Sequence, residues 1–183
     1  MNQKRKNRSN VREYALRLLK VRPRSKEELK ERLERKGYSL EEIDKVVEDL
    51  ERAGIIDDEK FSMLFAYDQL EFHTKGPHYV RYKLRMFGVD EATIEKVLRR
   101  AFEEDDVKNA IVRFVKNHCR KSENEIFKML VRRGFDTKMV HEILPVIYKD
   151  WRCEEDESGN NDNSDIRSGG HTGSDTGLPP GKD

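Results

Sequence analysis

The sequence is poor in cysteine and has no long hydrophobic run. Its 183 residues include two cysteines, Cys119 and Cys153, which form no CxxC pair. Two cysteines are too few for a disulfide framework, so we expect free thiols in a reducing compartment. No apolar stretch approaches the roughly 20 residues of a membrane-spanning helix, and no signal-peptide core follows the basic start. These absences predict a cytoplasmic protein.

The sequence also lacks the signatures of common enzymes. It contains no GxxxxGK[ST], GxGxxG, GxSxG or HExxH motif, and its five histidines are scattered without the spacing of metal ligands. The adjacent Asp57 and Asp58 directly precede a predicted helix, where acidic side chains cap the first N–H groups. We therefore expect no catalytic activity, no cofactor and no metal.

Charged residues, by contrast, are abundant at 40%, and the net charge of +1 conceals two unlike parts. Up to Cys153 there are 35 Lys and Arg against 28 Asp and Glu, whereas the rest has 2 against 8. We predict a basic flexible N-terminus (1–10) and an acidic disordered tail (153–183) that is too polar to form a core. The tail either folds back transiently over the basic body or is an inert extension.

Internal repetition is the strongest feature of residues 11–152. Gly37, Gly88 and Gly134 each lie between two pairs of hydrophobic residues with a spacing of four, which places each pair on one helix face. A left-handed C-cap conformation costs least at glycine. The pairs before the glycines are Leu29 and Leu33, Val80 and Leu84, and Ile126 and Leu130; those after are Ile43 and Val47, Ile94 and Leu98, and Val140 and Leu144.

Helix-start residues repeat in the same phase. Twelve residues before each glycine stand Ser25, Gly76 and Ser122, and two residues after stand Ser39, Asp90 and Asp136. Glu28 and Glu125 complete capping boxes with Ser25 and Ser122. A further helix precedes each block, at Val11 to Lys20, Asp58 to Phe72 and Asp105 to Lys116. We predict an all-α fold of three tandem three-helix units (11–56, 57–103 and 104–152) in an elongated, curved array.

A cation precedes each of these helix starts, at Arg24, Lys75 and Lys121. Because a helix N-terminus is partially positive, a cation gains nothing from the dipole there, and its recurrence suggests an approaching anion. The alternative is coincidence, since a fifth of the chain is basic. If the three side chains are exposed and bind an anion, reversing them to Glu weakens binding and leaves stability nearly unchanged. Arg132 and Arg133 extend this basic surface, whereas the aromatic residues Phe61, Phe65, Tyr67 and Phe72 are expected in the core.

The order and spacing of several short motifs resemble the RecX family from about Val11 to Trp151. Ser62 stands where the family usually has alanine. The motifs are Arg22-x-Arg24-Ser25-x-x-Glu28-Leu29 with Leu33 and Gly37, Gly54-Ile55-Ile56-Asp57-Asp58-x-x-Phe61, Gly76-Pro77 with Val80, Leu84 and Gly88-Val89, and Arg132-Arg133-Gly134-Phe135.

The resemblance implies a regulator of DNA repair, homologous recombination and the SOS response. Such a protein binds the RecA recombinase filament on single-stranded DNA along its helical groove and usually inhibits it. We expect a monomer with weak, non-specific affinity for single-stranded DNA and candidate contacts at Arg22, Arg24, Lys75, Lys121, Arg132 and Arg133. The alternative is a helix-turn-helix regulator of duplex DNA, since short helices joined by a glycine turn also describe that motif.

Overall fold

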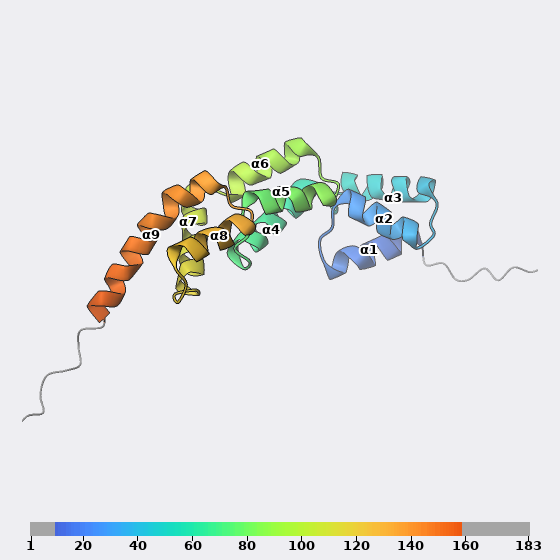
Figure 1. Ribbon diagram of the computed structural model, residues 1–183. Helices are drawn as coiled ribbons and strands as arrows, with labels where there is room; N and C mark the ends of the chain where they lie inside the picture. Colours follow the sequence, from blue (N-terminus) through green and yellow to red (C-terminus); the bar gives the residue numbers. More distant parts are fainter. Residues whose placement is uncertain (1–9, 159–183) are drawn as a thin grey trace, which may run out of the picture.

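The computed structural model describes residues 10–158, with side chains up to residue 149. This part of the chain consists of helices joined by short turns and contains no strand, which confirms the all-α class. The helices are α1 (Val11–Val21), α2 (Lys26–Arg35), α3 (Leu40–Arg52), α4 (Asp58–Glu71), α5 (Pro77–Met86), α6 (Glu91–Ala101), α7 (Glu104–Lys116), α8 (Glu123–Arg132) and α9 (Thr137–Ser158). In Figure 1 the groups α1–α3, α4–α6 and α7–α9 lie in this order from right to left.

The predicted helix boundaries rest on local capping. Gly37, Gly88 and Gly134 have φ angles of 90°, 72° and 92°, the left-handed conformation expected after a helix. Ser122 and Glu125 form the predicted capping box at the start of α8. Ser25, Ser39, Asp90 and Asp136 also accept hydrogen bonds from the first turn of their helices. Gly76 caps α5 without a side-chain hydrogen bond and is followed by Pro77 at the first helical position.

The hydrophobic pairs of the repeated blocks are buried in three separate clusters. All twelve paired residues on either side of the glycines are at most 6% exposed. The first cluster joins α1 to α3, the second joins α4 to α6, and the third joins α7 to α9 with Leu70 of α4 added. Each cluster therefore supports its own set of three helices.

Helix α4 departs from the expected pattern, because apolar residues surround it rather than forming one stripe. Phe61 and Leu70 face the core, but Tyr67 is 41% and Phe72 81% exposed, so their predicted burial is wrong. Helical spacing alone placed these rings inside, although the faces of α4 toward α5, α6 and α7 were already filled.

The boundary between the third block and the predicted tail also differs. Helix α9 continues through Cys153 to Ser158, so residues 153–158 are helical. Each residue added to an existing helix gains a hydrogen bond without a new nucleation cost. Residues 153–158 include neither glycine nor proline, so nothing in this segment breaks the helix. The remaining tail (159–183) and residues 1–9 lie outside the described residues. Within the described part, no helix combines the length and the apolar composition needed to cross a membrane.

Candidate functional site

The start of α2 lies against the glycine turn of the next block. The Ser25 hydroxyl donates to the carbonyl of Phe87 (2.5 Å), next to Gly88. The N–H of Lys26 donates to the carboxylate of Asp58 (2.8 Å), whose pKa is raised by burial despite this hydrogen bond. The first and second blocks are thus joined through polar groups at a helix start.

The same contact recurs between the second and third blocks. The N–H of Gly76 donates to the carbonyl of Arg133 (2.9 Å), and the N–H of His78 donates to that of Gly134 (3.0 Å). A Cβ atom at Gly76 would lie 2.3 Å from the backbone of Gly134, and one at Gly134 would lie 2.6 Å from the nitrogen of Tyr79. These glycines allow two backbones to touch, a second role that the sequence pattern did not reveal.

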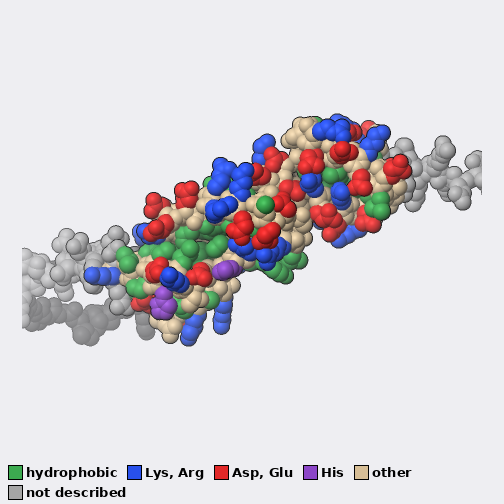
Figure 2. All heavy atoms as spheres, turned by 90° about the horizontal axis from the view of Figure 1, so that it is seen from above, with side chains coloured by type: hydrophobic (Ala, Val, Ile, Leu, Met, Phe, Trp, Pro, Cys, Tyr) green, Lys and Arg blue, Asp and Glu red, His purple; other side chains and the backbone are tan. Residues whose placement is uncertain are grey.

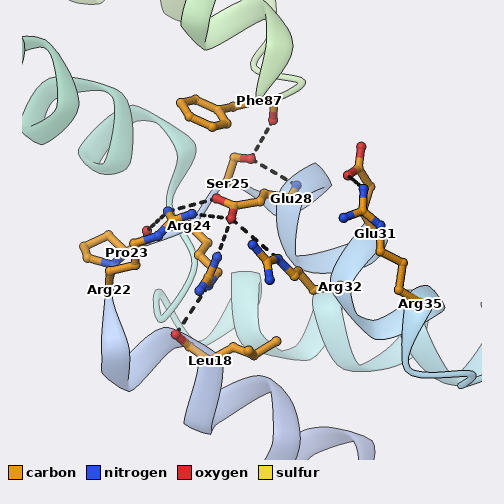
Figure 3. Close-up of polar contacts among 10 residues, drawn as sticks. All are labelled: Leu18, Arg22, Pro23, Arg24, Ser25, Glu28, Glu31, Arg32, Arg35 and Phe87. Carbon is orange, nitrogen blue, oxygen red and sulfur yellow. Dashed lines mark hydrogen bonds and ion pairs between the residues drawn. The ribbon is translucent and has the colours of Figure 1, made fainter.

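Immediately before the first of these helix starts, three arginines surround one glutamate (Figure 3). The Glu28 carboxylate, on a side chain that is 11% exposed, pairs with Arg22 and Arg24, and Arg32 lies 4.0 Å away. Arg24 also donates from Nε to the carbonyl of Leu18 (3.4 Å). Three guanidinium groups share one carboxylate, so the cluster carries a local surplus of positive charge.

Arg24 corrects the prediction that all three recurring cations are exposed. Its side chain is only 7% exposed, whereas that of Arg22 is 45% exposed. The turn between α1 and α2 folds Arg24 back onto both helices, where the ion pair with Glu28 offsets its desolvation. Glu28 is thereby drawn away from Ser25, so only half of the predicted capping box forms at this helix. Arg24 is a structural residue, and Arg22 presents the charge of the cluster to solvent.

Lys75 and Arg133 are brought together at the second junction. The Lys75 ammonium lies 4.7 Å from the ring centroid of Tyr79, and the Arg133 guanidinium lies 4.6 Å from that of Phe114. Arg133 also donates to the carbonyl of His73 (2.6 Å), which ties α8 to the end of α4. Both cations are half-buried, so the junction holds their stems and leaves part of each charge accessible.

The remaining two predicted cations lie at the two ends of α8, Lys121 just before it and Arg132 in its last turn. Lys121 precedes the N-cap and is 42% exposed, with its ammonium 3.8 Å from Glu125. Its carbonyl accepts a hydrogen bond from Tyr148. Arg132 is exposed in the last turn of the same helix. The six predicted residues therefore form separated basic points at the junctions and on α8 rather than one patch.

Much of the remaining surface charge is paired, and Figure 2 shows positive and negative side chains interspersed along the molecule. Exposed cations on several helices have a carboxylate within 3.0 Å, as in Lys26–Glu51, Lys30–Asp44, Arg85–Glu91 and Lys96–Glu59. Such exposed pairs contribute little to stability, but they cancel much of the basic excess. In each of these four pairs the partners lie on different helices, so helical spacing does not predict them.

The sequence of this chain is similar to proteins of known family. Family models described as the first and the second three-helix domain of RecX match residues 12–50 and 57–98. The "Regulatory protein RecX" of Thermotoga maritima is 39% identical over 131 residues, which is 72% of this chain and 80% of the relative. The chain belongs to the RecX family. Another family member, from Pelodictyon phaeoclathratiforme, is 34% identical over 143 residues, covering 73% of this chain and 86% of its own.

Solved structures of the family share the fold. The crystal structure of RecX from Lactobacillus salivarius aligns with a TM-score of 0.66 at 18% identity, covering 75% of this chain and 94% of that one. The first matched family segment contains the Glu28 cluster, and the second contains Lys75. Lys121, Arg132 and Arg133 lie beyond both segments, in the third block.

Proposed function

We propose that this protein binds the filament that a RecA-type recombinase forms on single-stranded DNA and inhibits the recombinase. Membership of a family of regulatory proteins supports a regulator, and the separated basic points suit a long partner with repeated anionic groups. The observation that carries the proposal is their spacing along successive blocks, from the Glu28 cluster through the Lys75 junction to Lys121. Many dispersed contacts on one partner add to a tight complex.

In this proposal the chain lies along the helical groove of the filament as three tandem units in an elongated, curved array. A body in that position blocks the access that DNA pairing and protomer exchange need, so inhibition requires no chemistry by this chain. The protein acts in the cytoplasm as a monomer, in recombination, DNA repair and the SOS response. On bare single-stranded DNA it binds weakly and with strong dependence on salt.

The alternative function, sequence-specific binding to duplex DNA, is disfavoured in the first two blocks by the charge of the helices that would read bases, whereas α9 has no acidic residue in its first turn. A recognition helix presents its N-terminal residues to the major groove. In α3 those residues include Glu41 and Glu42, and α6 begins with Glu91 after the N-cap Asp90. Carboxylates at this position repel phosphates, so α3 and α6 are unsuited to the role.

The proposal is tested by the ATPase activity of the recombinase on single-stranded DNA with the full chain added. We expect inhibition at equimolar protein, and at least about tenfold weaker inhibition by the triple variant Arg22→Glu, Lys75→Glu, Lys121→Glu. Arg24 is left unchanged because it is buried. The salt dependence of binding should become shallower with each lost phosphate contact.

The matched control reverses three exposed cations outside the junctions, Lys45, Arg99 and Lys116, so that the net charge changes equally. The control should inhibit almost as well as the parent. Thermal melting checks that every protein is folded at the assay temperature, because Arg22→Glu removes one ion-pair partner of Glu28. A parent chain without effect on the recombinase would refute the proposed function. Equal losses in both triple variants would show that net charge matters and the junction positions do not.

A further inference from the structure

The outer face of α4 carries an open apolar groove next to the Glu28 cluster. Its cavity of about 550 Å³ is lined by Arg22 and Pro23 on one side and by Leu64, Tyr67 and Phe72 of the α4 region. Leu64 is 60%, Tyr67 41% and Phe72 81% exposed. Large apolar side chains that gather on a surface in this way mark an interaction site more often than chance exposure.

The groove exists because α4 is more apolar than its neighbours can cover. Its buried residues Phe61, Ala66 and Leu70 pack toward α5, α6 and α7. Leu64 and Tyr67 are instead exposed and line the groove opposite Arg22 and Pro23. A helix that is apolar all round is normally covered on every side, so one face of α4 lacks its partner.

We infer that this groove, whose floor contains Leu64, Tyr67 and Phe72, docks an amphipathic helix of a protein partner. The described part of the chain offers no strand edge to which a partner's main chain could add. An open apolar groove along a helix is the surface on which an amphipathic helix lays its apolar face in helix-in-groove recognition. The inference rests on the proposed function, under which the partner that carries this helix is the recombinase.

Charge around the groove favours a protein segment over nucleic acid. Asp68 and Glu71 both lie on its lining, where they would repel phosphate groups. Glu71 is paired with Arg113 (2.6 Å), and Asp68 accepts a hydrogen bond from the side-chain amide of Gln69 (2.9 Å) and lies 3.7 Å from His73. Arg22 supplies positive charge, because the Glu28 cluster has three arginines and one carboxylate. A helix with an apolar face flanked by charges of both signs complements this rim.

The test measures affinity for the preformed recombinase filament on single-stranded DNA, with the full chain carrying Tyr67→Ser and Phe72→Ser. Both side chains are exposed, so the variant should melt like the parent. We expect binding to weaken by roughly 10- to 100-fold, as for the loss of two apolar anchors. The loss should persist at high salt, because burial of apolar surface is not screened, whereas the contribution of the basic points should fade.

The matched control is Tyr82→Ser with Met86→Ser on α5, two side chains that are 59% and 60% exposed and lie outside the groove. It should bind within about twofold of the parent. Parent-like binding by the groove variant would overturn the inference while leaving the proposed function intact. A parent that does not bind the filament would refute both.

Two further measurements identify other occupants. An equal loss of affinity for bare single-stranded DNA would mean that bases stack on Tyr67 and Phe72. If the isolated parent is a dimer in solution and the groove variant is a monomer, a second copy of the chain fills the groove. Either result overturns the assignment to a helix of the partner, whereas unchanged DNA affinity and mass with weakened filament binding support it.

Discussion

Arg24 is the buried partner of Glu28, whereas Arg22 pairs with the same carboxylate from a side chain that is 45% exposed. Removing the Arg24 guanidinium leaves Glu28, which is 11% exposed, with less compensation for its desolvation. We expect Arg24→Ala to lower the free energy of unfolding by about 2 to 3 kcal/mol, below the usual cost of breaking a buried pair because Arg22 and Arg32 remain. Denaturant unfolding measures this difference.

Arg35→Ala is the control at the residue scale. Arg35 is 71% exposed and pairs with Glu31 four residues away, at 3.0 Å. An exposed pair of this kind is worth about 0.3 to 0.5 kcal/mol. If both variants lost stability equally, burial of Arg24 would have no energetic consequence and its assignment as a structural residue would be wrong.

Ser62 differs from Arg24 in that its buried polar group has no hydrogen-bond partner. The residue is fully buried on α4, and its hydroxyl makes no hydrogen bond. Ser62→Ala removes an unsatisfied hydroxyl while keeping the volume nearly unchanged. We expect the free energy of unfolding to rise by about 1 kcal/mol, as measured by thermal or denaturant unfolding. A loss of stability would show that the hydroxyl is hydrogen-bonded in solution.

At the scale of elements, the contact between a helix start and a glycine turn joins each block to the next. Gly134→Ala tests it, because the added Cβ would lie 2.6 Å from the nitrogen of Tyr79, a backbone atom that cannot move aside alone. Gly54 is the matched control, with φ of +66° and no atom within 4 Å of an added Cβ. Both substitutions incur the left-handed strain of about 1 to 2 kcal/mol.

Gly134→Ala should therefore cost at least about 1 kcal/mol more than Gly54→Ala in the free energy of unfolding. The excess measures the close approach of the two backbones separately from the φ angle. Equal costs would mean that the second junction is loose in solution. In that case the spacing of Lys75 and Lys121 would not be fixed by the structure.

At the scale of the whole molecule, the proposal depends on an extended shape. A compact protein of about 150 residues has a radius of gyration near 15 Å. For a chain that ends at Trp151, we expect solution X-ray scattering to give a value several ångströms larger. A value near 15 Å would contradict an array that contacts successive turns of a filament groove.

The sequence by itself determined the helices and their cores. The glycine turns and the hydrophobic pairs around them depend on local properties, namely a φ angle and the helical period. Their structure could therefore be predicted from the sequence at Gly37, Gly88 and Gly134. The basic excess of residues 1–153 and the resemblance to the family were equally visible without coordinates.

Only the tertiary structure decided which charges and rings meet solvent. Arg24 and Arg22 are two residues apart in sequence, yet the turn between α1 and α2 buries one and exposes the other. Phe72 follows the helical spacing of core residues, but α5, α6 and α7 leave its side of α4 open. Burial and ion pairing depend on segments that are distant in the chain, which periodicity within one helix does not specify.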